Sequence, residues 1–139
     1  MMVRVAQRLG IGIGVLVLLA ILAWHAPFPR RMLEFRDARI YGKPGEVSAF
    51  SVRVTNNHAV CGATRIKVRI DFFGKDGKPI DGREIVLDGT VPSGNTRLIG
   101  EPYVGITGLP ERDGWTWTYT VVDAAASSLW CGSWFGMEP

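Results

Sequence analysis

The sequence predicts an all-β domain, an antiparallel β-sandwich of about seven short strands, preceded by one N-terminal transmembrane helix. Polar and apolar residues alternate in several short runs, which puts one face of each strand in a core and the other in water. Turn signals rich in glycine and proline separate these runs, and no amphipathic helical pattern follows residue 30. An uncharged apolar run from Gly10 to Trp24 predicts the helix.

The clearest strand is 65–72, in which Ile66, Val68 and Ile70 alternate with charged residues. The expected strands are residues 37–41, 50–55, 65–72, 83–87, 96–99, 115–121 and 129–135. The expected core includes Val52, Val54, Ile66, Val68, Ile70, Trp117 and Tyr119. Short strands with turn signals at regular intervals are typical of an immunoglobulin-like sandwich.

Three turn signals separate the strands. Residues 42–45 and 91–94 each combine proline with glycine, and residues 74–79 close a hairpin between two strands. Within that hairpin Gly77 is available for a positive φ.

The apolar run, counted from residue 9 to residue 28, reaches the roughly 20 residues that a bilayer-spanning helix needs. Its uninterrupted core is shorter, so a cleaved signal peptide is the alternative. A cleavage site requires small residues at two positions before the cut, and the two candidate sites carry Ile21 or Trp24 at the first of them. We therefore expect an uncleaved anchor, with an N-terminal tail at 1–8, the transmembrane anchor at 9–28, a linker at 29–34 and the β-sandwich domain at 35–139.

The chain has two cysteines, Cys61 and Cys131, and they lie far from any metal-binding spacing. Two cysteines in a small exported domain predict one disulfide, worth about 4 kcal/mol in the chain-entropy model. The alternative is two separate buried thiols. Because Cys61 lies in the loop after the second expected strand and Cys131 near the last one, we expect the disulfide to fasten the tail at the periphery of the core.

The expected orientation in the membrane is inferred from the arginines on either side of the apolar run and from the two cysteines. Arg4 and Arg8 before the apolar run favour a cytoplasmic N-terminus, whereas Arg30 and Arg31 after it oppose that orientation. A disulfide requires an oxidising compartment. We therefore expect a single-pass protein of the inner (cytoplasmic) membrane of a bacterium, with its C-terminal domain in the periplasm.

The middle of the chain resembles a broad group of bacterial immunoglobulin-like domains. The matching segments are Val52–Asn57, the strand and hairpin Asp71–Ile80, and the turn Val91–Thr96. Together they cover about a third of the chain and are similar to the FxLYD-like and LEA14-like sandwiches. The chain also resembles the membrane-anchored periplasmic accessory subunits that carry such domains, and this resemblance implies binding or scaffolding rather than catalysis.

The residues suggest no catalytic chemistry, no cofactor and no small-molecule substrate. Serine-nucleophile and phosphate-loop motifs are absent from the sequence. A copper or zinc site would have to combine His58 with Cys61 and Cys131, which is fewer ligands than a structural site uses. Similar membrane-anchored sandwiches serve as copper chaperones, but they carry a tight cysteine pair that this chain lacks. The charged residues of the domain nearly balance, since Arg4 and Arg8 account for most of the formal charge of +3, so a dedicated nucleic-acid partner is not expected.

Three surfaces are candidates for binding. The exposed sides of the strands carry a basic stripe, Arg53, Arg65, Lys67 and Arg69, that could meet an acidic partner or lipid headgroups; the preferred alternative is a solvated, edge-protecting face. Small residues in the anchor, Gly10, Gly12 and Gly14, can pack against another transmembrane helix, or reflect ordinary glycine usage. The tail carries more apolar surface than a last strand needs, in Trp130, Trp134, Phe135 and Met137.

We expect a non-catalytic accessory or scaffolding subunit of a larger membrane protein complex, respiratory, photosynthetic, secretory or division-related. It would bind other subunits and the lipid bilayer through its helix and its outer-face domain. The alternatives are an assembly factor or metallochaperone for such a complex, and a secreted binding module released by signal cleavage.

Overall fold

The computed structural model describes residues 12–21, 27–110, 114–128 and 131. After a short 3-10 helix η1 (Arg30–Met32), the described chain is all-β, and every strand pairing is antiparallel. The six longer strands are β1 (Leu33–Tyr41), β3 (Ala49–Asn56), β4 (Ala63–Gly74), β5 (Pro79–Val86), β7 (Thr96–Glu101) and β9 (Trp115–Ala126). Three two-residue strands complete the set: β2 (Glu46–Val47), β6 (Thr90–Val91) and β8 (Ile106–Thr107).

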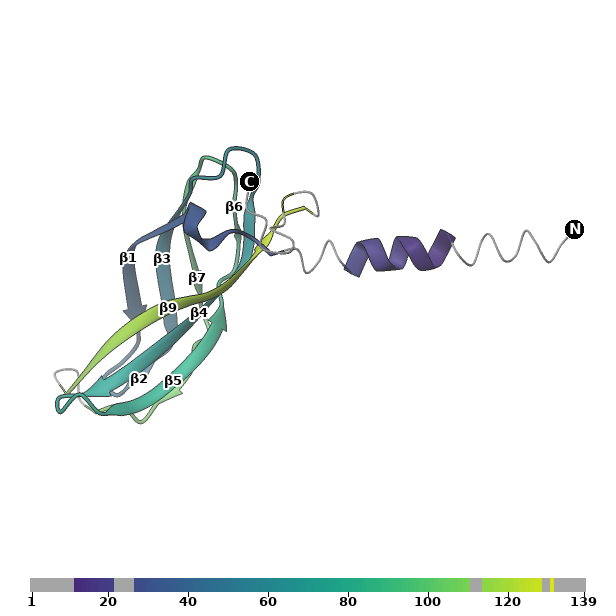
Figure 1. Cartoon of the computed structure of the whole chain (residues 1–139). Coiled ribbons are helices and arrows are strands. Elements are labelled where there is room, and N and C mark those ends of the chain that lie inside the picture. The colour runs from purple at the N-terminus through teal and green to yellow at the C-terminus, as the bar shows by residue number, and fades with distance from the viewer. Residues whose placement is uncertain (1–11, 22–26, 111–113, 129–130, 132–139) are drawn as a thin grey trace, which may run out of the picture.

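The strands form two main sheets that pack face to face (Figure 1). One sheet has the order β1-β3-β7; in the other, β4 lies between β9 and the edge formed by β5 and β6. Aromatic contacts join the layers, because the Phe50 ring of β3 lies 6.1 Å from Trp117 and 5.8 Å from Tyr119 of β9. The core lies between these sheets and is built from the inward-facing residues of both.

The alternation read from the sequence is confirmed. Five of the expected core residues are fully buried: Val52, Val54, Ile66, Val68 and Ile70. Trp117 and Tyr119 are half-buried and pack on the core, while the threonines between them are exposed. Gly77 has the predicted positive φ of 77° in the β4–β5 hairpin.

The strand limits differ from the sequence-based ones in several places. β1 begins at Leu33, four residues before the expected start, because a bulge between Arg36 and Arg39 lets it follow β3 further than a regular alternation suggests. The two-residue strands were missed because so short a segment shows no periodicity. Of the expected strand 129–135, only Cys131 lies among the described residues.

The structure moves the N-terminal domain boundary. Phe28, at the end of the expected anchor, is 3% exposed and belongs to the core cluster. The expected linker consists of η1 and the start of β1. The domain therefore begins near Pro27. An apolar side chain that lies close to the sandwich gains as much free energy from burial in the protein core as from burial in lipid.

Residues 12–21 form a helix (Figure 1). Its large apolar side chains are exposed by 44% to 68%. Within the part of the chain that the structure describes, no helix has the length and hydropathy needed to cross a membrane.

Candidate functional site

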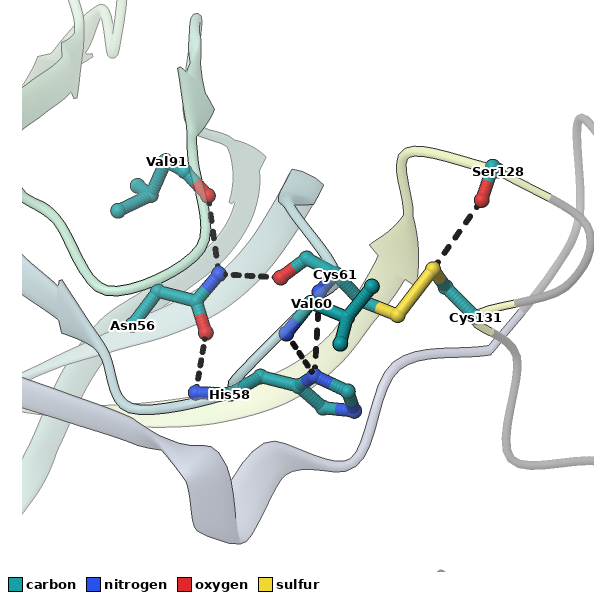
Figure 2. Close-up of a disulfide and its surroundings, with 7 residues drawn as sticks. All are labelled: Asn56, His58, Val60, Cys61, Val91, Ser128 and Cys131. Carbon is teal, nitrogen blue, oxygen red and sulfur yellow. Dashed lines mark hydrogen bonds between the residues drawn. A yellow bond between two sulfur atoms is a disulfide. The ribbon is translucent and has the colours of Figure 1, made fainter.

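A covalent link joins the loop between β3 and β4 to the segment after β9. Cys61 and Cys131 form the predicted disulfide, with a Cα–Cα distance of 5.5 Å across 70 residues of sequence (Figure 2). Neither cysteine belongs to a strand. Cys61, however, is 6% exposed and belongs to the core cluster, so this end of the disulfide is part of the core rather than peripheral.

The buried amide of Asn56 organises the loop around the disulfide. Its Nδ2 donates to the carbonyl oxygens of Cys61 at 2.7 Å and Val91 at 3.0 Å. Its Oδ1 accepts from the backbone N–H of His58 at 2.9 Å (Figure 2). Asn56 is the one polar residue among the buried residues of the described chain. Since its donors and acceptor are all used, it connects β3, the loop and β6 without an unsatisfied polar atom.

His58 closes the same loop. Its Nδ1 accepts from the backbone N–H groups of Val60 at 3.2 Å and Cys61 at 3.1 Å (Figure 2). An acceptor role at Nδ1 requires the tautomer that carries its proton on Nε2. The imidazole ring also lies 5.7 Å from the Phe28 ring, and this contact brings the N-terminal segment onto the loop.

The N-terminal segment is attached to β9 as well. Pro27 forms a bridge with Ala125, and the Phe28 N–H donates to the Ala124 carbonyl at 2.9 Å. One guanidinium nitrogen of Arg30, Nη1, donates to the carbonyl oxygens of Val121 and Val122, at 3.1 and 2.7 Å. We call the set Phe28, Asn56, His58, Cys61 and Cys131 the Cys61 junction.

The Cys61 junction fixes two chain segments at one end of the domain. The segment that follows the predicted anchor is held there by Phe28, and the start of the tail is held there by the disulfide. The amide of Asn56 and the Nδ1 atom of His58 already form hydrogen bonds, and the sulfur atoms of Cys61 and Cys131 are already bonded to each other. It therefore acts as a clamp.

The structure does not assemble the predicted basic stripe. Arg53 lies on β3, in the sheet opposite to the one that carries the other three residues, and it pairs with Asp37 at 3.4 Å. On β4, Arg69 contacts Asp71 at 2.9 Å and lies opposite Glu84 of β5. Acidic neighbours therefore offset the positive charges. Asp71 belongs to β4 itself, whereas Asp37 and Glu84 come from other strands, so alternation along β4 alone could not show them.

Lys67 and Arg65 belong to the same face of β4. Lys67 lies opposite Asp123 of β9, so its charge also has an acidic neighbour. Arg65 has a positive φ of 45° and lies where the β4–β9 register shifts. This bulge disturbs the regular row that the sequence predicts.

The other predicted binding residues are described only in part. Gly12 and Gly14 lie in the helix of residues 12–21, and a Cβ added to either would meet no atom within 4 Å. Gly10 and the tail residues Trp130, Trp134, Phe135 and Met137 lie outside the described residues.

One hollow on the surface of the domain does not resemble a catalytic site. It has a volume of about 370 Å³, and it lies over β3 and β7 beside the exposed side chains of Tyr41 and Leu98. It is open to solvent. No group of three or more histidine, cysteine, aspartate or glutamate side chains among the described residues is placed to hold a metal ion.

The inward row of β9 is unusual in its chemistry. Burial raises the pKa of the Tyr119 hydroxyl, and the buried Trp115 Nε1 has no hydrogen-bond partner among the described residues. Sequence reasoning placed Tyr119 in the core but missed Asn56, Phe28 and Arg30. Their roles depend on neighbours far away in sequence, and an asparagine at the end of a strand reads as an ordinary turn residue.

Comparison with protein-family models, with curated proteins and with solved structures gives no match. The function is therefore argued from the chain's own residues and geometry.

Proposed function

We propose that this protein is a non-catalytic accessory or scaffolding subunit of a larger membrane protein complex. The observation that carries the proposal is the Cys61 junction. It holds the segment after the expected anchor and the start of the apolar tail at the same end of the domain. Phe28 and Cys131, which adjoin the segments proposed to bind lipid and protein, therefore lie at one end of the domain.

The exposed helix supports the membrane part of the proposal. An apolar helix with side chains such as Ile13, Leu16 and Leu18 more than half exposed is unstable in water and needs a cover of lipid or of other helices. The apolar sequence continues on both sides of residues 12–21, which is why we propose an anchor that begins at residue 9 and ends before Pro27, where the β-sandwich domain starts. A domain with a disulfide then lies on the oxidising, periplasmic side.

The strand order supports an immunoglobulin-like topology. In immunoglobulin sandwiches, strands A, B and E share one sheet, while C′, C and F lie together in the other. The order β1-β3-β7 against β5-β4-β9 reproduces this arrangement. Such domains act mainly as binding and spacing modules, although a fold alone does not define a function. The likeness to FxLYD-like and LEA14-like domains stays part of the proposal.

The test is extraction of the full chain from its native membrane with a mild detergent, followed by native separation and identification of co-migrating proteins. We expect a stoichiometric complex. Trp134→Ala should release the partner while the domain stays folded, because a few buried aromatics dominate interface energies. Gly12→Leu and Gly14→Leu should weaken binding within the membrane.

Val60→Ala is the matched control, because Val60 is 79% exposed on the domain and should not affect the complex. A full-length protein that migrates alone at native expression levels would contradict the proposal. So would an intact mass showing that the chain begins after residue 23, because it would remove the anchor.

A further inference from the structure

The two sheets have four outer edges, and three of them are protected against pairing with another strand. β1 carries Glu34, Arg36 and Arg39 and is interrupted by a bulge. β5 starts with proline and contains three charged residues, and β7 is only six residues long and contains two. Charges, proline, bulges and short length are the usual means by which proteins block edge pairing.

The edge of β9 lacks these protections along most of its length. The stretch Trp115–Val122 contains no charge and no proline, and its β-branched and aromatic residues strongly favour extended structure. One long side of β9 pairs with β4. Among the described residues, no strand pairs with the other side.

Part of this free side is already occupied by the N-terminal segment. Pro27 and Phe28 cover the edge at Ala124 and Ala125, and the Arg30 guanidinium takes the carbonyls of Val121 and Val122. With respect to the residues that the structure describes, the open part is therefore Trp115–Thr120. Six residues is the usual length of a strand in a sheet, so this segment can accept one.

We propose that the Trp115–Thr120 edge binds an uncharged, extended segment of the partner subunit, which adds to the sheet as a strand. This inference rests on the proposed function and specifies how the partner is held. Backbone hydrogen bonds supply affinity in strand addition, and alternate side chains supply specificity. On the inward side the segment would place apolar residues beside Trp117 and Tyr119. On the outward side small hydroxyl or β-branched residues would match Thr116, Thr118 and Thr120.

A second copy of this chain fits the edge less well. Antiparallel pairing of two β9 strands about a two-fold axis would put their two N-terminal segments at opposite ends of the pair. β9 has 12 residues, which corresponds to roughly 40 Å. Two anchors that enter one membrane from opposite ends of such a pair would require the strands to lie along its surface. A separate partner segment carries no such restriction.

The experiment measures hydrogen exchange of full-length protein in mild detergent. The probe is an acetylated and amidated peptide of alternating valine and threonine; the control is the same peptide with its threonines replaced by lysine. We expect the uncharged peptide to slow exchange of backbone amides in residues 115–120 by about tenfold or more, and the lysine peptide to have no effect.

Two variants test whether the peptide protects these amides by binding at the β9 edge. Thr118→Lys places a charge on the exposed row of β9 and should abolish the protection. Leu98→Lys places the same charge at an exposed position of β7 in the other sheet and should preserve it. Thr116→Lys replaces Thr118→Lys if that variant does not fold.

Several results would overturn the inference. Protection that is absent, or that falls outside β9, excludes strand addition here. If the same amides are protected without peptide, the edge is already occupied by another strand. Protection that depends on protein concentration identifies a second copy as the occupant, and protection that does not identifies a segment of the same chain. If the native complex survives Thr118→Lys unchanged, the inference fails although the proposed function stands, whereas a chain that never forms a complex contradicts the proposed function itself.

Discussion

The two ends of the sandwich are held by different kinds of contact. At the β4–β5 hairpin, the N–H of Gly74 donates to Lys78 and the N–H of Lys78 donates to the Asp76 carboxylate, so the contacts are local. At the Cys61 junction, Asn56 reaches Val91 across 35 residues and the disulfide spans 70. The first end follows from its turn sequence, whereas the second requires the whole fold to be in place.

The two ends of the sandwich also differ in how far their polar groups are exposed to water. The hairpin end is exposed, and its polar groups remain hydrated if a contact is lost. The junction buries an amide and two backbone carbonyls, so the loss of a partner there leaves polar groups without water. Substitutions should therefore cost much more at the junction than at the hairpin.

The largest effect is expected for Asn56→Asp. The change replaces the donor that serves the Cys61 and Val91 carbonyls with a carboxylate oxygen and buries a charge. We expect a loss of about 4 kcal/mol or more, enough to prevent stable folding. Asn57→Asp is the control, because Asn57 is exposed. Circular dichroism of the two purified variants makes the comparison, and a folded Asn56→Asp protein would show that the amide is not structural.

The next effect is expected from removal of the disulfide. Replacing Cys61 and Cys131 together with alanine should lower the free energy of unfolding by about 4 kcal/mol, because the bridge closes a long loop. Denaturant titration measures this loss. Reduced wild-type protein should fall to a similar value, and an unchanged midpoint in either sample would contradict the prediction.

A smaller effect is expected at the hairpin. Gly77 has a φ of 77°, and an added Cβ meets no atom within 4 Å, so Gly77→Ala strains the backbone alone. We expect a cost of about 1 kcal/mol. Gly77→Asn should cost less, because asparagine tolerates this conformation better. Equal costs for both, measured by thermal unfolding, would indicate that φ is not the cause.

The smallest effect is expected on the outer face of β4. Lys67 is partly exposed, and its neighbour Val68 is fully buried. Lys67→Ala should change the free energy of unfolding by no more than about 0.5 kcal/mol. Val68→Asp should prevent folding, because it buries an unpaired carboxylate. Similar damage from both would mean that the alternation has been misread.

The sequence by itself determined the inward residues of the longer strands and the hairpin. Alternation along β4 and β9 identifies the inward residues because the period of a strand is two, and the Gly77 turn is a local feature. The cysteine count and the expected compartment were enough to predict the disulfide, since only one pairing exists. Each of these conclusions needs information from only a few neighbouring residues or from a count.

Only the tertiary structure decided the charge of the β4 face, the role of Asn56 and the docking of Phe28. Lys67 and Arg69 have acidic neighbours on β9 and β5, which are distant in sequence. From the sequence alone, Asn56 is interpreted as a turn residue and Phe28 as a membrane residue. Their contacts, of Asn56 with Val91 and of Phe28 with Ala124, show their actual roles. The physical reason is the same in each case: burial and charge compensation depend on which distant strands become neighbours, and pattern along the chain does not contain that information.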